Sequence, residues 1–134
     1  MEPPEGYEHQ DGNHMVWKLK KAIYGLKQSP RDWYDTLISW LTDPENKITG
    51  FKQSVNDPCL FSKKVGDKEM WTCIYVDDML MLGDQSLIEE FMTGIKDEYK
   101  IRDLGVPSSF LGMELNRHDE GRSCTITCKR YIEN

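Results

Sequence analysis

The sequence IYVDDMLMLGD, residues 74–84, places two adjacent aspartates, Asp77 and Asp78, inside an otherwise apolar run. Apolar residues also dominate EMWTCIYV, residues 69–76, before the pair and MLMLG, residues 79–83, after it. Each flank has the length and composition of a strand, and aspartate is favoured in turns. The stretch therefore predicts a tight antiparallel hairpin that carries both aspartates at its tip.

The two carboxylates of Asp77 and Asp78 repel each other, and a carboxylate beside a sheet core is costly unless a partner neutralises it. A divalent cation removes both penalties, because Mg²⁺ prefers oxygen ligands and is usually held by one or two carboxylates together with substrate phosphates. A simpler interpretation is a hairpin whose turn is polar because it faces water. Spacing alone leaves both interpretations open.

Outside this hairpin the pattern predicts a mixed architecture. Ser29 offers an N-cap with Pro30 at the first helical position, and Ser86 with Glu89 has the spacing of a capping box. The expected core includes Trp33, Tyr34, Leu37 and Phe91. The predicted elements are a helix from 29 that stops before Pro44, a strand at 59–64, a helix that begins at 86, and a second hairpin of strands 110–117 and 123–130. This order predicts an α+β fold with an antiparallel sheet and helices packed on one face.

The charge of the chain is uneven. Seventeen basic and 23 acidic residues give a net charge of −6 over 134 residues, which disfavours a general nucleic-acid coat protein. Residues 12–31 nevertheless carry five bases and no acid, whereas residues 77–103 carry eight acids and three bases. One part of this single domain can hold an anion while another holds a cation.

The four cysteines show no zinc-binding spacing and are expected to be free, buried thiols of a reducing compartment. No apolar run approaches the ~20 residues of a membrane span, and the first residues do not resemble a signal peptide. The expected location is therefore intracellular and cytoplasmic, with no membrane partner.

The motif YVDD between apolar strands resembles the catalytic motif of reverse transcriptases, and the wider sequence resembles the enzymes of copia-type LTR retrotransposons. The matching segments occur in the order of that family and cover almost the whole chain. They are PPEGY (3–7), LKKAIYGLKQSPRDWY (19–34), GF and DPCLF (within 50–61), IYVDDMLMLG (74–83), DLG (103–105), FLGMEL (110–115) and CKRYIEN (128–134).

The resemblance implies an RNA-directed DNA polymerase with a palm subdomain and part of the fingers, so that residues 1–134 form a partial reverse transcriptase domain. In that family two Mg²⁺ or Mn²⁺ ions act on the primer 3′ oxygen and the nucleoside triphosphate. Asp77 and Asp78 match the catalytic, metal-binding pair of the hairpin. Tyr75 matches the aromatic residue that lies against the primer end.

Other site residues follow from the same resemblance. Gln28 and Lys27, together with Tyr75, are assigned to the nucleotide and template side, and Lys18, Lys20 and Lys21 are further candidates for phosphate contact. The segment from Phe110 to Leu115 resembles the hairpin that grips the primer. Its Leu111, Gly112 and Met113 are therefore assigned to primer binding, with Gly112 expected to permit close backbone approach.

The sequence departs from the family pattern at both ends. The third metal-binding carboxylate of the family lies in a strand upstream of PEGY, and Asp11, in the turn-like QDGN, is no substitute for it. The thumb would begin near KRYIEN. The expectation is an internal fragment of a retrotransposon polyprotein that is inactive alone. Its expected partners are an RNA or DNA template with a DNA primer, deoxynucleoside triphosphates and the rest of the polyprotein, in a virus-like particle of the parent element.

Two other functions stay open on the sequence. The chain can be a non-catalytic nucleic-acid-binding or protein-interaction module retained from a retroelement, and a sheet face left exposed would favour this alternative. A different metal-dependent enzyme with a palm-like fold, such as a nucleotide cyclase, is disfavoured because the glycine-rich signature of such enzymes is missing.

Overall fold

A computed structural model describes residues 3, 6, 16–46 and 48–132, apart from the side chain of Arg130. The chain forms two units by its internal contacts, Met1–Trp40 and Leu41–Asn134. The first unit holds almost all of helix α1, Ser29–Leu41. No helix among the described residues is both long enough and apolar enough to cross a membrane. Asp11, most of PPEGY and the last two residues of CKRYIEN lie outside the described residues.

The second unit contains a four-stranded antiparallel sheet in the order β1-β2-β3-β4. Its strands are β1 (Lys52–Gln53), β2 (Leu60–Val65), β3 (Lys68–Tyr75) and β4 (Asp78–Gly83). The predicted strand at 59–64 and the hairpin around the aspartate pair are confirmed within one or two residues. Strand β1 was not predicted, because two residues are too short for a period-2 pattern to show.

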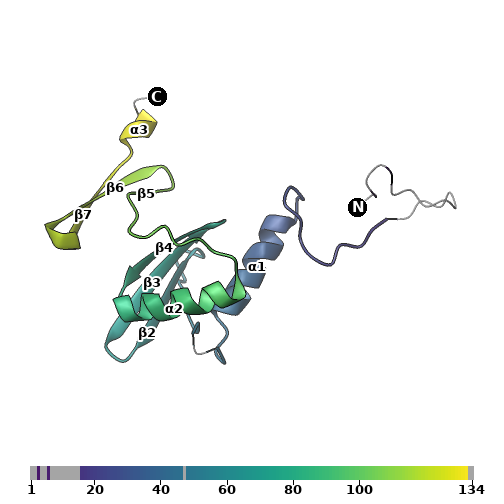
Figure 1. Cartoon of the computed structure of the whole chain (residues 1–134), viewed down its shortest axis with the longest axis horizontal. Helices are drawn as coiled ribbons and strands as arrows, with labels where there is room; N and C mark the ends of the chain where they lie inside the picture. The colour runs from purple at the N-terminus through teal and green to yellow at the C-terminus, as the bar shows by residue number, and fades with distance from the viewer. Residues whose placement is uncertain (1–2, 4–5, 7–15, 47, 133–134) are drawn as a thin grey trace. The chain divides into compact units, whose positions relative to one another are not determined.

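One face of this sheet is buried beneath helix α2, Gln85–Glu98, which contacts β3 and β4 (Figure 1). Along β3 the buried and exposed side chains alternate, as strand geometry requires, so that Met70, Thr72 and Ile74 face the core. Phe51 and the helix residue Phe91 meet edge to face with 5.1 Å between ring centroids. The predicted α+β class is therefore confirmed, with α2 on one face of the sheet.

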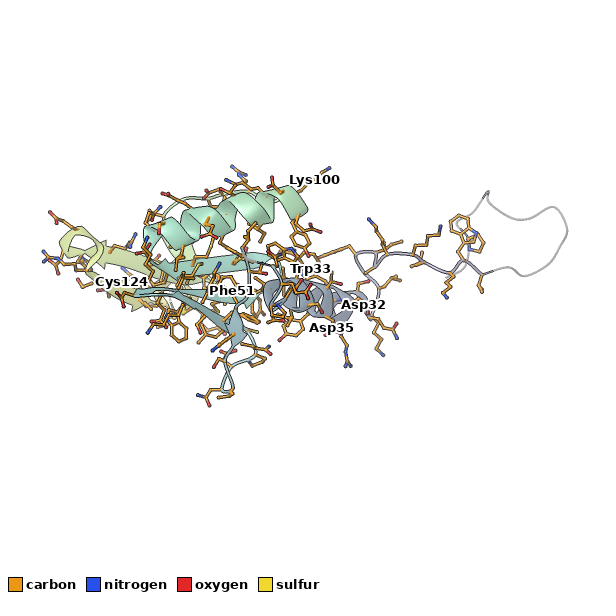
Figure 2. All side chains as sticks on the ribbon, turned by 90° about the horizontal axis from the view of Figure 1, so that it is seen from below. Asp32, Trp33, Asp35, Phe51, Lys100 and Cys124 are labelled. Carbon is orange, nitrogen blue, oxygen red and sulfur yellow. The ribbon has the colours of Figure 1, made fainter. Side chains whose placement is uncertain are left out.

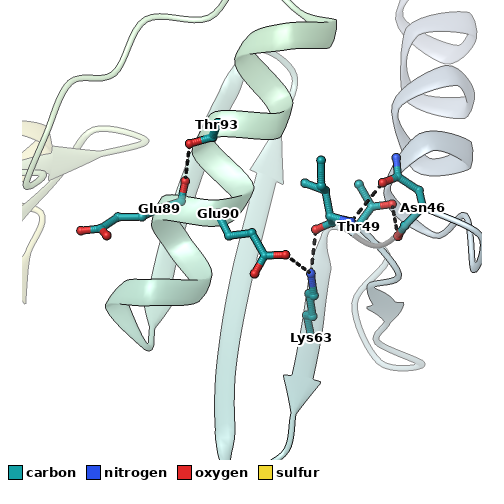
Figure 3. Close-up of polar contacts among 7 residues, drawn as sticks. Asn46, Thr49, Lys63, Glu89, Glu90 and Thr93 are labelled. Atoms are coloured by element: carbon teal, nitrogen blue, oxygen red, sulfur yellow. Dashed lines mark hydrogen bonds and ion pairs between the residues drawn. The ribbon is translucent and has the colours of Figure 1, made fainter.

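Lys63 is a charged residue inside this core, with only 8% of its surface exposed. It projects from β2, and its Nζ donates a 2.8 Å hydrogen bond to the Ile48 carbonyl and lies 4.0 Å from a Glu90 carboxylate oxygen of α2 (Figure 3). The Asn46 side chain in turn accepts a hydrogen bond from the Ile48 amide. These bonds satisfy the buried cation and connect the 46–49 loop to the sheet.

Both predicted serine caps are wrong by one or two residues. At α1 the Gln28 carbonyl accepts the first helical hydrogen bond, from the Asp32 amide, so Ser29 lies inside the helix and donates its hydroxyl to the Ile23 carbonyl. At α2 the cap is Asp84, whose carboxylate accepts from the amide and hydroxyl of Ser86. The Ser86 hydroxyl bond lowers the pKa of Asp84. Serine close to a helix start can serve either as the cap or as a donor in the first turn.

The predicted second hairpin is present as β6 and β7, and a short strand β5 extends it to a separate three-stranded antiparallel sheet in the order β5-β6-β7. Its strands are β5 (Ser109–Phe110), β6 (Met113–His118) and β7 (Ser123–Thr127), followed by the short helix α3 (Lys129–Ile132). The prediction of one continuous strand over 110–117 is wrong, because the chain reverses at Leu111 and Gly112. The predicted strand 123–130 ends at Thr127.

The burial of the predicted core residues and of the cysteines agrees with expectation only in part. Leu37 and Phe91 are buried as predicted, whereas Trp33 and Tyr34 are only half-buried. All four cysteines are free, but Cys124 and Cys128 are exposed and Cys59 and Cys73 half-buried, so the expectation of buried thiols is wrong. Burial raises the pKa of the Cys73 thiol, which keeps it protonated at neutral pH.

Candidate metal-binding hairpin

The aspartate pair lies at the turn of the β3–β4 hairpin. Tyr75 pairs directly with Asp78, so the loop between the strands consists of only Val76 and Asp77. Asp78 begins β4, and both aspartates are exposed. Within the part of the chain that the structure describes, neither carboxylate has a hydrogen-bond or ion-pair partner. The oxygens of both side chains are therefore available to an external cation.

The uncovered face of the sheet carries part of this site. Because side chains alternate along a strand, Trp71, Cys73 and Tyr75 of β3 lie on the face opposite α2, and Asp78 pairs with Tyr75 on that same face. Tyr75 is 55% exposed and Trp71 39% exposed. The hairpin thus presents a carboxylate and an aromatic side chain together on a solvent-accessible sheet face.

The backbone of this turn is strained. Val76 has φ +53°, a left-handed conformation that is rare for a β-branched residue, whereas Asp77 does not have a positive φ. This is the φ pattern of a type II′ turn, which normally has glycine at its first central position. The β2–β3 hairpin at the other end of β3 has the same loop length, and there Gly66 occupies that position with φ +61° before Asp67. The two hairpins therefore differ mainly at the first loop position, where glycine adopts the left-handed conformation without strain and valine does not.

Replacement of Val76 by glycine is expected to raise the free energy of unfolding by about 1 kcal/mol, because left-handed strain of a non-glycine residue costs of order 1–3 kcal/mol and the gain is partly offset by glycine entropy. Urea denaturation followed by circular dichroism measures this change. The reverse substitution in the matched turn, Gly66→Val, is expected to lower stability. A Val76→Gly protein less stable than the original would contradict the strain assignment.

The other predicted site residues lie in two further segments. Gln28 and Lys27 are exposed residues of the first unit, next to the start of α1, and Gln28 contributes its backbone carbonyl to the helix start. Leu111 and Gly112 form the β5–β6 turn with φ +51° and +79°, the pattern of a type I′ turn, and Met113 begins β6. A Cβ at Gly112 would meet nothing within 4 Å, so among the described residues the positive φ of the turn, and not a close contact, accounts for this glycine. The close approach of Gly112 to a primer stays a prediction.

The structure brings Tyr75, Asp77 and Asp78 together at one hairpin. Among the described residues, no group of three or more His, Cys, Asp or Glu side chains is arranged to hold a metal ion. The donor set nevertheless suits Mg²⁺ or Mn²⁺ in part, because such ions are often held by two carboxylates completed by substrate phosphates. Tyr24, an exposed residue with no predicted role, lies in the same basic segment as Lys27.

Comparisons with known proteins identify one family. A family described as "Reverse transcriptase (RNA-dependent DNA polymerase)" matches residues 1–134. The chain is 36% identical over 99% of its length to the retrovirus-related Pol polyprotein from transposon TNT 1-94 of Nicotiana tabacum, and 35% identical over 98% to that from transposon RE1 of Arabidopsis thaliana. It is 28% identical over 96% of its length to a putative transposon Ty5-1 protein of Saccharomyces cerevisiae, 40% of which is covered.

The match covers only part of the polyproteins. The chain spans 10% of the tobacco relative and 9% of the Arabidopsis relative. No solved structure matches the chain. The resemblance that the sequence motifs indicated is confirmed, because a family match over the whole chain and relatives above 30% identity agree with it. The chain therefore belongs to the reverse transcriptase (RNA-dependent DNA polymerase) family and is related to the Pol polyproteins of copia-type retrotransposons.

Proposed function

We propose that this chain is the palm, with part of the fingers, of a retrotransposon reverse transcriptase whose parent protein polymerises DNA on an RNA or DNA template. The observation that carries the proposal is the pair Asp77 and Asp78, which lies at a hairpin tip beside a sheet face that α2 leaves uncovered and has no hydrogen-bond or ion-pair partner among the described residues. A turn that is polar only because it faces water does not require an exposed aromatic sheet face beside it. The uncovered sheet face also fits a non-catalytic binding module, but such a module does not require two adjacent carboxylates at the hairpin tip.

Asp77 and Asp78 would hold Mg²⁺ or Mn²⁺, with Asp77 as the principal ligand. When bound, the metal supplies positive charge that neutralises the primer 3′ oxygen and the triphosphate of the incoming nucleotide. The two carboxylates keep that charge at the end of the uncovered sheet face, where Tyr75 packs against the primer end. The strained Val76 fixes the backbone between Tyr75 and Asp77, so that the positions of both carboxylates depend on a single hairpin.

The third carboxylate would come from a further strand that pairs with β4. Strand β4 is an edge of its sheet among the described residues. The Ile74 amide donates to the Cys59 carbonyl on the β2 side, so its partner Met79 directs its own amide away from β3 by the alternation of antiparallel pairs. An edge with outward amides readily accepts another strand. A strand of the parent polyprotein bound there would bring its carboxylate close to Asp77 and Asp78.

The remaining predicted residues act on substrate in this proposal. Gln28 and Lys27, exposed beside the start of α1, contact the template base and the nucleotide phosphates. Leu111, Gly112 and Met113, in the tight β5–β6 turn, contact the primer strand. The expected substrates are deoxynucleoside triphosphates and a primed template, and the parent particle would be intracellular.

Primer extension tests this function. A purified longer segment of the parent polyprotein that contains these 134 residues should extend a DNA primer on an RNA template with Mg²⁺ or Mn²⁺. The 134 residues alone should give no detectable extension, because two carboxylates without a third ligand position the reacting oxygens poorly, and an error of about 1 Å can cost ~100-fold in rate. Extension by the 134 residues alone would contradict the incomplete-site proposal, and failure of the longer segment would contradict the polymerase proposal.

A further inference from the structure

Tyr24 is displayed at a tight turn in the first unit and is 98% exposed. The Leu26 amide donates a 3.3 Å hydrogen bond to the Ile23 carbonyl, and Gly25 has φ +93°. This places Gly25 at the third position of a four-residue turn with a positive φ, the pattern of a type II turn. Tyr24 occupies the second position, where its side chain points outward from the turn into solvent.

The turn is anchored to helix α1 by Ser29, which is buried. The Ser29 hydroxyl donates a 2.6 Å hydrogen bond to the Ile23 carbonyl, and its amide donates a 3.1 Å hydrogen bond to the Leu26 carbonyl. Both ends of the turn are therefore held by one residue of the first helical turn. Tyr24 has a supported backbone but no packing role, which is unusual for a side chain with so much apolar surface.

The segment around Tyr24 is basic, and the first acids after it are Asp32 and Asp35 of α1, of which Asp35 lies 3.8 Å from Arg31. Residues 16–31 contain five bases and no acid, although the whole chain carries a net charge of −6. All five basic side chains are exposed: Lys18, Lys20, Lys21, Lys27 and Arg31. Trp17 and Ile23 in the same segment are 39% and 47% exposed. A basic segment that displays aromatic side chains is the composition that binds single-stranded nucleic acid, with cations on the phosphates and rings on the bases.

We propose that Tyr24 stacks on an unpaired base of a single-stranded nucleic acid whose phosphates the surrounding lysines hold. This inference rests on the proposed polymerase function, because a polymerase holds a single-stranded template and Tyr24 lies in the same segment as Lys27 and Gln28, which that proposal assigns to the template. Bases within a duplex are already stacked on each other and offer no free face to Tyr24. Single-stranded RNA or DNA therefore fits this surface better than a double helix.

Fluorescence anisotropy with the 134-residue chain tests the proposal. A labelled oligothymidylate of about 16 nucleotides and an oligouridylate of equal length form the DNA and RNA arms. Tyr24→Ala should weaken binding in at least one arm by about 5- to 100-fold, the range expected for loss of one stacked base, and Tyr24→Phe should retain it. The two arms show whether the base belongs to DNA, RNA or either.

Three controls separate stacking from charge and from misfolding. An abasic oligomer of the same length keeps its phosphates, so Tyr24→Ala should bind it as tightly as the original protein, whereas Lys20→Ala should bind both oligomers more weakly. Tyr131→Ala removes another aromatic side chain, 87% exposed, and should change nothing. The proposal is overturned if Tyr24→Ala leaves binding of both base-containing oligomers unchanged, or weakens the abasic oligomer equally.

The measurement is made in EDTA, so it does not depend on the metal-binding hairpin. A protein that binds oligomers through Tyr24 but fails in primer extension would retain this inference and refute the polymerase proposal. If a protein extends primers but Tyr24→Ala does not change its oligomer binding, the polymerase proposal is retained and the inference about Tyr24 is refuted.

Discussion

Asp77→Asn is expected to reduce primer extension by an active longer segment of the parent polyprotein at least ~10³-fold. Asparagine keeps the size of the side chain and the hairpin turn but removes the negative charge that a hard divalent cation requires. Since the metal neutralises charge on both the attacking and the leaving oxygens, loss of its principal ligand affects the chemical step itself. Steady-state extension with Mg²⁺ on an RNA template measures the change.

The β2–β3 hairpin provides a matched control for this substitution. Asp67 follows Gly66 in the β2–β3 turn with the same loop length as Val76 and Asp77, at the opposite end of β3. Asp67→Asn therefore removes an exposed turn carboxylate from the same sheet without touching the proposed site, and extension should stay unchanged. Equal losses for Asp67→Asn and Asp77→Asn would show that the effect comes from net charge or stability, and would refute a metal-binding role.

Gly83→Ala is expected to lower the free energy of unfolding by about 4 kcal/mol or more, a large fraction of the stability of a small domain. Gly83 ends β4 with φ +143°, and a Cβ there would lie 2.5 Å from the Met70 Cα and still closer to the Glu69 carbonyl oxygen. That carbonyl also accepts the 2.9 Å hydrogen bond from the Asp84 amide, at the cap of α2. The clash is with backbone, which cannot move aside as a flexible side chain can.

The comparison variant is Gly66→Ala. Gly66 has φ +61°, but a Cβ there would meet nothing within 4 Å, so its cost should be only the left-handed strain of about 1–2 kcal/mol. Urea denaturation of both variants, followed by circular dichroism, measures the difference. Similar losses for the two glycines would contradict the close approach of β3 and β4 at Gly83.

The elements with strong periodicity could be predicted from the sequence. The β3–β4 hairpin followed from two apolar flanks around an aspartate pair, and α2 followed from an amphipathic face that includes Phe91. Local signals were less reliable, because Ser29 and Ser86 can each serve as a cap or as a donor in the first turn. The break at Leu111 was not predicted, since Leu-Gly lacks the turn preference of Asn-Gly or Asp-Gly.

The candidate site was predicted in part. Sequence motifs located Asp77 and Asp78, and strand alternation then places Asp78 with Tyr75 on the uncovered face. The left-handed conformation of Val76 could not be predicted, because valine is among the residues least compatible with a positive φ. The exposure of Tyr24 could not be predicted either, because it depends on a turn held by the hydrogen bonds of Ser29 and not on a sequence pattern around the tyrosine.

Paramagnetic broadening by Mn²⁺ tests most directly whether the β3–β4 hairpin is the metal-binding half of the site. In a ¹⁵N-labelled 134-residue chain, amide signals of residues 76–79 should broaden first, with affinity on the order of millimolar because a third carboxylate is missing. Asp77→Asn combined with Asp78→Asn should remove this effect, whereas Asp67→Asn should not. Asp32 and Asp35, both on α1, provide an exposed acidic pair for comparison (Figure 2). Broadening that begins at α1, or that persists at residues 76–79 in the double variant, would contradict the account.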